Sequence, residues 1–357
     1  MAFVKMQPYI WIPSAPEIYG AEWAGASDPA WTRTNDAAGL SDPNPAVNNG
    51  NGNSPFDTIY PWKDMKRVEN SAAGTLVEIP KFYYKRIRSG TKMKLLITDR
   101  PSDGFFVSPA HADREDGKGE RDVVYVAAYQ CASDYKSKTG VLPLGNKTRA
   151  EFRTGIHSLG SDIWQNDFAL YWTIRMLYLV EYVHWNSQQK IGYGCSDNGS
   201  PQHSGVCDSM IYHTGTNAPN RTTYGHTRYR YIEDLYGNAY EWCDGIYFEG
   251  ANIYCIKNPA YFSDDSGGTL VGQRAMTEGY ISSLTNPTVA GFEYALYANG
   301  SNGSESTYIC DFMNTGGAVF LIGALHQSQY RGLFGMLGSN SPLSVFASCG
   351  SRLMKLP

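Results

Sequence analysis

The 357-residue sequence lacks the uninterrupted apolar stretch of about 18 residues that a membrane-spanning helix requires. Its most apolar stretch, residues 168–185, is interrupted by Arg175, Glu181 and His184. The first residues also lack a basic segment followed by a long apolar run, which is the pattern of a secretory signal. We therefore expect no membrane insertion and no secretory leader, and we expect the protein to be made in a cytoplasm.

Closely spaced cysteine pairs and clusters of basic residues are missing as well. The seven cysteines are an odd number, which excludes complete pairing and favours reduced thiols. A net charge of −4 without a basic cluster argues against a nucleic-acid partner. Cys195, His203 and Cys207 share a loop, but they supply only three good ligands and no Cys-x-x-Cys pair. We expect no metal and no cofactor.

Aromatic residues and glycine are abundant, with 26 tyrosines, eight tryptophans and 37 glycines. Tyrosine and tryptophan suit both half-wet cores and binding surfaces, and this much glycine implies many turns. A chain of this length can bury a large core, so we expect one large domain with a smaller element. No Ser–His–Asp order, phosphate-binding glycine loop or paired-carboxylate motif stands out, and we expect the protein not to be an enzyme.

Residues 1–60 differ from the rest in their many prolines and in the turn-rich stretch 44–54. Tyr9, Trp11 and Trp23 nevertheless carry apolar surface that favours burial. We expect a small β-rich element here, packed against the main body or against a neighbouring copy, and a main domain over residues 61–357.

Strands and two helices are predicted in the first half of the main domain. Residues 75–79, 82–87, 92–97 and 122–129 have the composition of strands, and the second and third are joined by a tight turn as in a hairpin. Thr148 and Glu151 have the spacing of a capping box, which predicts a helix over 148–158.

A second helix is predicted over residues 166–189. Leu170, Ile174 and Leu177 recur at three- and four-residue spacing, the apolar stripe of a packed helix, and the other face is apolar too. Glu181 falls on the main stripe, where we expect it to be hydrogen-bonded in place. The fold class expected is α+β, with two helices packed on a twisted, mainly antiparallel sheet.

The last forty residues, 316–357, consist of short apolar runs bounded by glycines, which is typical of strands joined by tight connections. Residues 324–330 break this pattern because apolar, aromatic and polar side chains follow without a period. Two interpretations remain open at this stage, an ordinary pair of C-terminal strands or a binding face.

The turn Gly237-Asn238-Ala239-Tyr240-Glu241-Trp242 is similar to that of the formylglycine-generating-enzyme branch of the C-type lectin fold. The order of parts from about residue 61 agrees with that branch. The pieces 316–319, 331–334, 340–342 and 350–353, with their Gly-Gly and Gly-x-Arg, resemble the variable proteins of diversity-generating retroelements. Several of those are phage tail receptor-binding proteins, and others are displayed on bacterial surfaces.

This resemblance implies a C-type lectin-like domain over 61–357 with a diversified segment over 316–353. It implies a ligand-binding face that would engage a host cell-surface protein or glycan, on a virion tail or, alternatively, a bacterial cell surface. It also implies a homo-oligomer, for which we expect a trimer with Tyr9, Trp11 and Trp23 at the interface. The implied ligand-binding side chains lie between the fixed glycines: Ile322, Ala324, Leu325, His326, Gln327, Tyr330, Met336, Leu337, Leu343, Val345, Phe346 and Ser348.

Three alternatives remain beside that expectation. Some of Ile322, Leu337 and Val345 could point inward as strand core. The chain could be an oxidase like the formylglycine-generating enzymes, but these need two closely spaced cysteines that bind copper, and Cys310 and Cys349 are far apart in sequence. Finally, the chain could be a purely structural tail subunit, in which case the surface formed by the segment 316–353 would be buried in the assembly.

Overall fold

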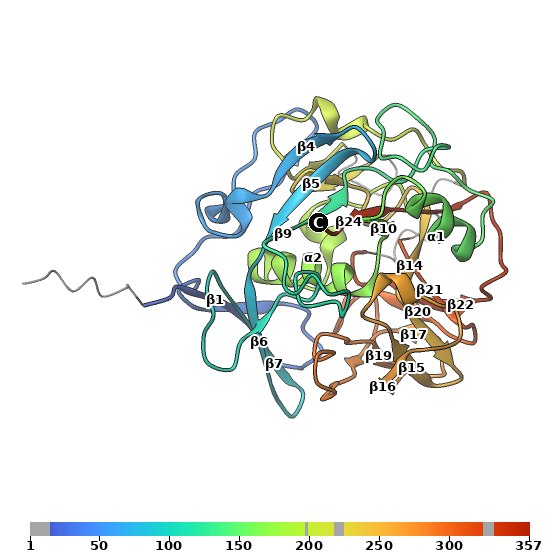
Figure 1. The fold of residues 1–357 in the computed structure, drawn as a ribbon. Coiled ribbons are helices and arrows are strands. Elements are labelled where there is room, and N and C mark those ends of the chain that lie inside the picture. The colour runs from blue at the N-terminus through green and yellow to red at the C-terminus, as the bar shows by residue number, and fades with distance from the viewer. Residues whose placement is uncertain (1–14, 197–198, 218–224, 324–331) are drawn as a thin grey trace, which may run out of the picture.

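A computed structural model describes residues 15–196, 199–217, 225–323 and 332–357. Within these residues the chain is mainly β, with three α-helices among its sheets, as Figure 1 shows. The coarse expectation of an α+β protein dominated by antiparallel sheet is confirmed. Among the described strand pairs, three are parallel: β3 with β11, β14 with β23, and β20 with β22.

The described strands form several sheets. The first has the order β2-β1-β7-β6-β8 and consists of β1 (Ile18–Trp23), β2 (Trp31–Asn35), β6 (Tyr83–Ser89), β7 (Lys92–Thr98) and β8 (Phe106–Val107). The second has the order β10-β24-β9-β5-β4 and consists of β4 (Lys66–Asn70), β5 (Gly74–Pro80), β9 (Val123–Ala127), β10 (Ile163–Gln165) and β24 (Leu353–Lys355).

The third sheet has the order β13-β12-β11-β3 and consists of β3 (Ala46–Val47), β11 (Gly215–Thr216), β12 (Thr227–Tyr229) and β13 (Ile232–Glu233). The largest sheet contains β14 (Tyr240–Glu249), β15 (Asn252–Cys255), β16 (Thr269–Gln273), β17 (Gly279–Tyr280), β20 (Phe312–Asn314), β21 (Val319–Ile322), β22 (Met336–Asn340) and β23 (Cys349–Ser351). A separate pair joins β18 (Ser283–Leu284) and β19 (Ala298–Gly300).

The helix α2 (Phe168–Tyr182) lies in the centre of the molecule (Figure 1), and all of its residues are buried. It packs against β1 and β7 on one side and against β14 on another. Ile174 and Leu177 are fully covered, which confirms the apolar periodicity. Glu181 is held by hydrogen bonds from Ser54, Tyr229 and Arg230, as expected of a charged group on a buried stripe.

The second helix ends earlier than the predicted residue 189. Tyr182 is its last residue, and Val183 has the left-handed φ of 46° that terminates it. A separate short helix, α3 (Ser187–Lys190), follows. Between them Trp185 turns into an aromatic cluster, with its ring centroid 5.1 Å from that of Trp31 and 5.6 Å from that of Trp23. The apolar pattern therefore continues past the helix because the tertiary core continues.

The first helix, α1 (Arg149–His157), matches the prediction closely. Thr148 is its N-cap, and the reciprocal Thr148–Glu151 bonds of a capping box are both present. Such a box satisfies two backbone N–H groups that would otherwise have no partner.

The amino-terminal residues are joined to the main body through the first sheet. β1 pairs with β7 along its whole length, from Ile18 opposite Thr98 to Trp23 opposite Met93. Residues 18–35 are therefore part of a sheet whose other strands come from residues 83–107. Trp23 is buried in the aromatic cluster of its own chain, so the expectation that it lies at a subunit interface is wrong. Tyr9 and Trp11 lie outside the described residues.

Two hydrophobic cores lie on the two faces of the largest sheet. Phe320, Ile322 and Met336 join the core around α2, whereas Leu321 and Leu337 join the core beneath α1. Since successive residues of a strand point to opposite faces, β21 and β22 are covered on both sides. Within the part of the chain that the structure describes, no helix is both long and apolar enough to span a bilayer.

Candidate ligand-binding face

The strand β14 brings two separate parts of the C-terminal segment together at one end of its length in the largest sheet. Glu241 lies opposite Ile322 of β21 on one side and opposite Gly350 of β23 on the other. β21 is antiparallel to β14, so it ends where β14 begins. β23 is parallel to β14, so it begins at that same end. β21 therefore ends, and β23 begins, at the end of the sheet where β14 begins; β22 comes between them in the sequence and pairs with β21.

The loop 341–348, which leads into β23, exposes three large apolar side chains. Leu343 is 82% exposed, Val345 51% and Phe346 43%, although the loop is only eight residues long. Its backbone is held at the β23 end, where the Tyr240 amide donates to the Ser348 carbonyl at 2.9 Å. The loop thus combines a fixed backbone with an apolar surface, and clustered exposed apolar groups mark interaction sites.

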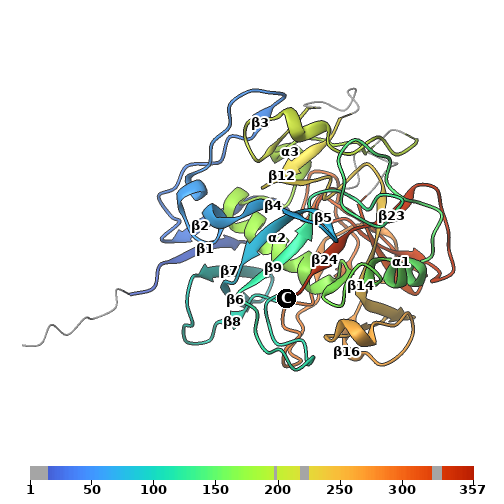
Figure 2. The ribbon, with the colours of Figure 1, turned by 45° about the horizontal axis from the view of Figure 1, so that its top comes forward.

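Residues 142–147 run beside this loop and extend the surface. The Asn146 amide donates to the Phe346 carbonyl at 2.8 Å. A Cβ on Gly145 would lie 2.3 Å from the Ala347 carbonyl oxygen, so this close approach requires glycine. Leu142 is half exposed in the same segment. We call residues 142–147 and 341–348 together the C-terminal face; Figure 2 shows it at the side of the molecule that carries α1 and β23.

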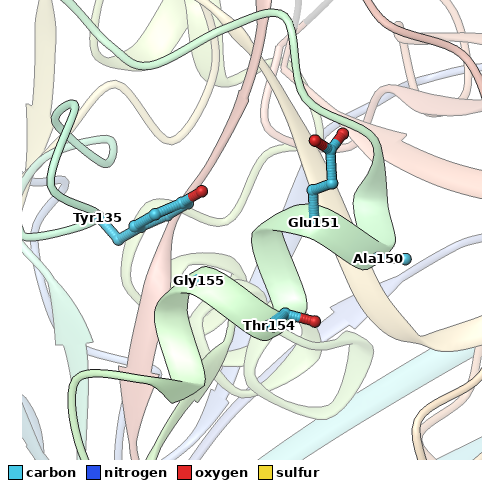
Figure 3. A pocket seen from close by; sticks show the side chains of 5 residues that line it. All are labelled: Tyr135, Ala150, Glu151, Thr154 and Gly155. Carbon is cyan, nitrogen blue, oxygen red and sulfur yellow. The ribbon is translucent and has the colours of Figure 1, made fainter.

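A shallow depression of about 400 Å³ lies along α1, whose N-cap Thr148 directly follows residues 142–147. Figure 3 shows Glu151 and Thr154 pointing outward from α1, with the Tyr135 ring beside the helix. The ring fits because residue 155 is glycine: a Cβ there would come within 2.1 Å of it. The depression thus offers the Thr154 hydroxyl beside the Tyr135 ring, whereas the Glu151 carboxylate is already bonded by Thr148 and Lys147.

Glycines and buried polar groups fix the ends of the segment between β21 and β22. Gly323 has a φ of +77°, where other residues are strained. On the far side, the Leu333 amide donates to Ser187 Oγ at 2.8 Å and the Phe334 amide to Asp311 Oδ2 at 2.8 Å. Arg175, buried on α2, donates to the Leu333 carbonyl at 2.6 Å. These bonds hold the flanks of the segment to the core.

The structure divides the predicted binding residues into three groups. Leu343, Val345 and Phe346 are exposed on the C-terminal face, and Ser348 is half-buried at its edge. The second group lies in the strands, where Ile322, Met336 and Leu337 are buried, so their prediction as surface contacts is wrong. The reason is that β21 and β22 are covered on both faces. The third group lies outside the described residues: Ala324, Leu325, His326, Gln327 and Tyr330.

The Gly-x-Arg motif and the Gly-Asn-aromatic-Glu-Trp turn meet in the core. Arg352 Nη2 lies 2.8 Å from Glu241 Oε1, and both side chains are almost fully buried. Arg352 also donates to the carbonyls of Ala127, Glu233 and Asp234. The guanidinium therefore ties β9, β13 and β14 to the closing strands, which places these two motifs in the scaffold rather than on the surface.

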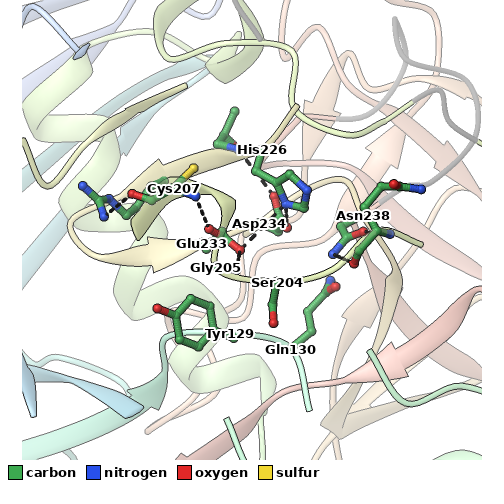
Figure 4. A network of polar contacts seen from close by, with 12 residues as sticks. Tyr129, Gln130, Ser204, Gly205, Cys207, His226, Glu233, Asp234 and Asn238 are labelled. Carbon is green, nitrogen blue, oxygen red and sulfur yellow. Dashed lines mark hydrogen bonds and ion pairs between the residues drawn. The ribbon is translucent and has the colours of Figure 1, made fainter. Parts of the chain in front are cut away.

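Next to this pair, His226, Glu233 and Asp234 bring possible metal-ligand atoms within 4.8 Å of one another (Figure 4). Hydrogen bonds already engage all three. His226 Nδ1 lies 2.6 Å from Asp234 Oδ2, and Glu233 accepts from the backbone amides of Gly205 and Cys207. We interpret the cluster as a buried ion-pair network that holds residues 205–207 against residues 226–234.

The electrostatics of this network fit that interpretation. Burial disfavours a charged imidazole, but the Asp234 carboxylate overcomes this and raises the pKa of His226 to about 9. Burial, and then the neighbouring Asp234 charge, raise the pKa of Glu233 to about 7. Cys207 is buried beside Glu233, while His203 is exposed on the surface, so the structure does not gather Cys195, His203 and Cys207 into one polar site.

All seven cysteines are buried free thiols. Burial, and then the Glu241 charge, raise the pKa of Cys349 well above its usual value. Burial, and then Asp311, raise the pKa of Cys310 to about 12. In the metal-free protein these surroundings favour the neutral thiol at both positions.

Leu142 and Tyr135 belong to the surface around the predicted site but were not predicted. Neither has a local sequence signal, because Tyr135 reaches α1 and residues 142–147 reach the loop 341–348 only in the folded chain. The sequence matches no protein-family model and no curated protein at a significant level.

Proposed function

We propose that this protein is a receptor- or ligand-binding protein that uses its C-terminal face to engage a host cell-surface protein or glycan. The observation that carries the proposal is the exposure of Leu343, Val345 and Phe346 on a loop whose backbone is held to a buried frame. A rigid frame with an exposed apolar loop loses little conformational entropy on binding, which favours affinity.

The resemblance of the Gly-Asn-aromatic-Glu-Trp turn and of the closing Gly-x-Arg suggests a finer identity. We infer a C-type lectin-like fold of the formylglycine-generating-enzyme type and a variable protein of a phage or prophage tail, with display on a bacterial surface as the alternative. The burial of Glu241 and Arg352 supports a scaffold role for these motifs. The exposed loop 341–348, which precedes the Gly-x-Arg motif, supports a role in binding.

An assembly of several copies would suit this function, and a homotrimer is the proposed state. Multivalent display raises a weak single-site affinity without any new contact. Light scattering at micromolar concentration tests this state directly, and a monomer would contradict it.

An oxidase function is the competing proposal. It needs two cysteines that hold copper near the C-terminus, and the surroundings of Cys310 and Cys349 disfavour the thiolate. Equilibration of the purified protein with copper(I), followed by metal analysis, distinguishes the two functions. Stoichiometric copper that is lost in a Cys349→Ser variant would favour the oxidase.

Binding is tested by replacing Leu343 and Phe346 singly with Ala and measuring adsorption to host cells. Loss of adsorption with an unchanged melting temperature is the expected result. Exposed Ile211 lies in a different segment, and Ile211→Ala is the matched control for removing an exposed apolar side chain. If all three variants adsorb like the wild type, the C-terminal face is not the binding surface, and a structural subunit becomes the better assignment.

A further inference from the structure

Five asparagines in the sequence are directly followed by glycine, and four of these pairs lie in the described residues: Asn49–Gly50, Asn51–Gly52, Asn299–Gly300 and Asn302–Gly303. In such a pair the backbone nitrogen of the glycine can attack the side-chain carbonyl carbon of the asparagine, which releases ammonia and closes a cyclic imide. Glycine hinders this attack least, because it has no Cβ and reaches backbone angles that other residues avoid. This reaction makes asparagine a thermolabile residue.

Backbone hydrogen bonds hold the attacking nitrogen in two of the four pairs. The Gly50 amide donates to the Val47 carbonyl at 3.0 Å, and the Gly303 amide donates to the Tyr280 carbonyl at 2.9 Å. Each nitrogen must lose its hydrogen bond before it can attack the neighbouring side chain, so the folded structure slows the reaction at both pairs.

A third pair, Asn299–Gly300, is held by strand pairing. Both residues belong to β19, where Gly300 lies opposite Ser283 of β18. The Ser283 hydroxyl also donates to Asn299 Oδ1 at 2.7 Å. Because the reaction requires the asparagine side chain to turn back onto its own backbone, the pairing and this hydrogen bond both oppose it.

The fourth pair, Asn51–Gly52, lacks these restraints. Asn51 is exposed, in the loop that follows β3, and Figure 2 shows β3 at the top of the molecule. Within the described part of the chain, no hydrogen bond engages the Asn51 side chain or the Gly52 amide. Both reacting groups are therefore free of competing bonds.

We propose that Asn51 deamidates spontaneously, through a cyclic imide with Gly52, to isoaspartate and aspartate. The bond from the Gly52 nitrogen to Asn51 Cγ forms as the bond from Cγ to Nδ2 breaks, and Nδ2 leaves as ammonia with the proton of the Gly52 amide. Water, the only co-reactant, then opens the imide. Attack of water at Cγ gives aspartate, whereas attack at the backbone carbonyl carbon gives isoaspartate, whose backbone contains one more carbon atom.

The contacts that follow Asn51 fit the normal backbone length. A Cβ on Gly52 would lie 2.2 Å from Tyr212 Cδ1, so this glycine packs closely against the ring. The next residue, Asn53, exchanges two backbone hydrogen bonds with Asn44, at 2.8 and 2.9 Å. An extra backbone carbon before Gly52 displaces the glycine from the ring or Asn53 from Asn44. Isoaspartate therefore loosens the loop 44–53, whereas aspartate keeps the backbone as it is.

The test incubates the full chain in ¹⁸O-labelled water at mildly alkaline pH and follows each pair by peptide mapping, with fragmentation that distinguishes isoaspartate from aspartate. In the native protein Asn51 is expected to react about fivefold faster than Asn49 or Asn302, because each of those pairs must first lose a backbone hydrogen bond. In denaturant the three rates should converge, since the folded structure no longer protects any of them. Asn51→Gln is the control that should lose the fast reaction, because glutamine must close a larger ring.

The effect on the loop is tested with Asn51→Asp, which carries the charge of both products on a backbone of normal length. This variant is expected to melt like the wild type, and protein aged until isoaspartate predominates at position 51 is expected to melt lower. Equal native rates at Asn49, Asn51 and Asn302, or a fast reaction that persists in Asn51→Gln, would overturn the proposal. Equal melting temperatures for the aged protein and Asn51→Asp would overturn the inferred effect on the loop.

Discussion

Arg352 Nη2 lies 2.8 Å from Glu241 Oε1 in the interior, between the closing strands and β14. Glu241 also accepts from Gln130 Nε2 at 2.9 Å, so the carboxylate is satisfied by more than its ion pair. The two residues are 111 positions apart, and the loop that we propose for binding lies just before the strand that leads to Arg352. The pair therefore joins β14 to the closing strands that follow the loop 341–348.

Replacing Arg352 with Met should destabilise the protein by about 3–5 kcal/mol, because it leaves the Glu241 carboxylate buried without its cation. Urea denaturation followed by tryptophan fluorescence measures this change. Lys147→Met is the control, since it removes an exposed partner of Glu151 and should cost about 0.5 kcal/mol or less. A loss below about 1 kcal/mol in Arg352→Met would show that the pair does not support the frame.

Met336 and Leu343 should respond to truncation in opposite ways, although both were predicted from the sequence as binding residues. Met336 is completely buried, so Met336→Ala should cost about 2–5 kcal/mol of stability. Leu343 is exposed, so Leu343→Ala should change stability by about 0.5 kcal/mol or less and should weaken ligand binding. Thermal melting and adsorption, measured on the same preparations, separate the two effects. Equal melting temperatures for both variants would contradict this assignment.

The elements that were predicted well have local signals. The capping box of α1 involves residues three apart, and the apolar stripe of α2 is continuous along one helix. The elements that were predicted less well depend on distant partners. The end of α2 is set by Val183 and by the packing of Trp185 against Trp23 and Trp31, which no pattern within the helix indicates.

The candidate site illustrates the same limit. The exposed positions Leu343, Val345 and Phe346 were predicted from their place between fixed glycines. The buried positions Met336 and Leu337 were included wrongly, because a strand covered on both faces does not alternate between apolar and polar residues.

Stability should fall as the pH rises from about 6.5 to 9, because the buried carboxylates of Asp234 and Glu233 favour the protonated form of His226. The folded pKa of His226 is raised to about 9 against an unfolded value of about 6.5. This contribution is fully present below pH 6.5 and is lost as the pH passes 9, a change of about 3 kcal/mol. The raised pKa of Glu233, about 7, acts in the same direction between about pH 4.5 and 7.

Urea denaturation at several pH values measures this dependence, and His226→Gln is the informative variant. It should be less stable than the wild type at pH 6.5 and should show a flatter profile between pH 6.5 and 9. His203, which is exposed, provides the control His203→Gln with a wild-type profile. A variant at position 226 that keeps the wild-type slope would show that another group is responsible.

The seven cysteines should be unreactive in the folded protein and fully reactive after unfolding. All are buried, and burial is the largest cause of the raised pKa values of Cys131, Cys207, Cys243, Cys255, Cys310 and Cys349. The attacking species is the thiolate, so a raised pKa and a covered sulfur both slow the reaction. Titration with a chromogenic disulfide should therefore release little dye from native protein and seven equivalents in denaturant. Fewer than seven equivalents in denaturant without reductant would reveal a disulfide, and rapid reaction of Cys349 in native protein would revive the oxidase proposal.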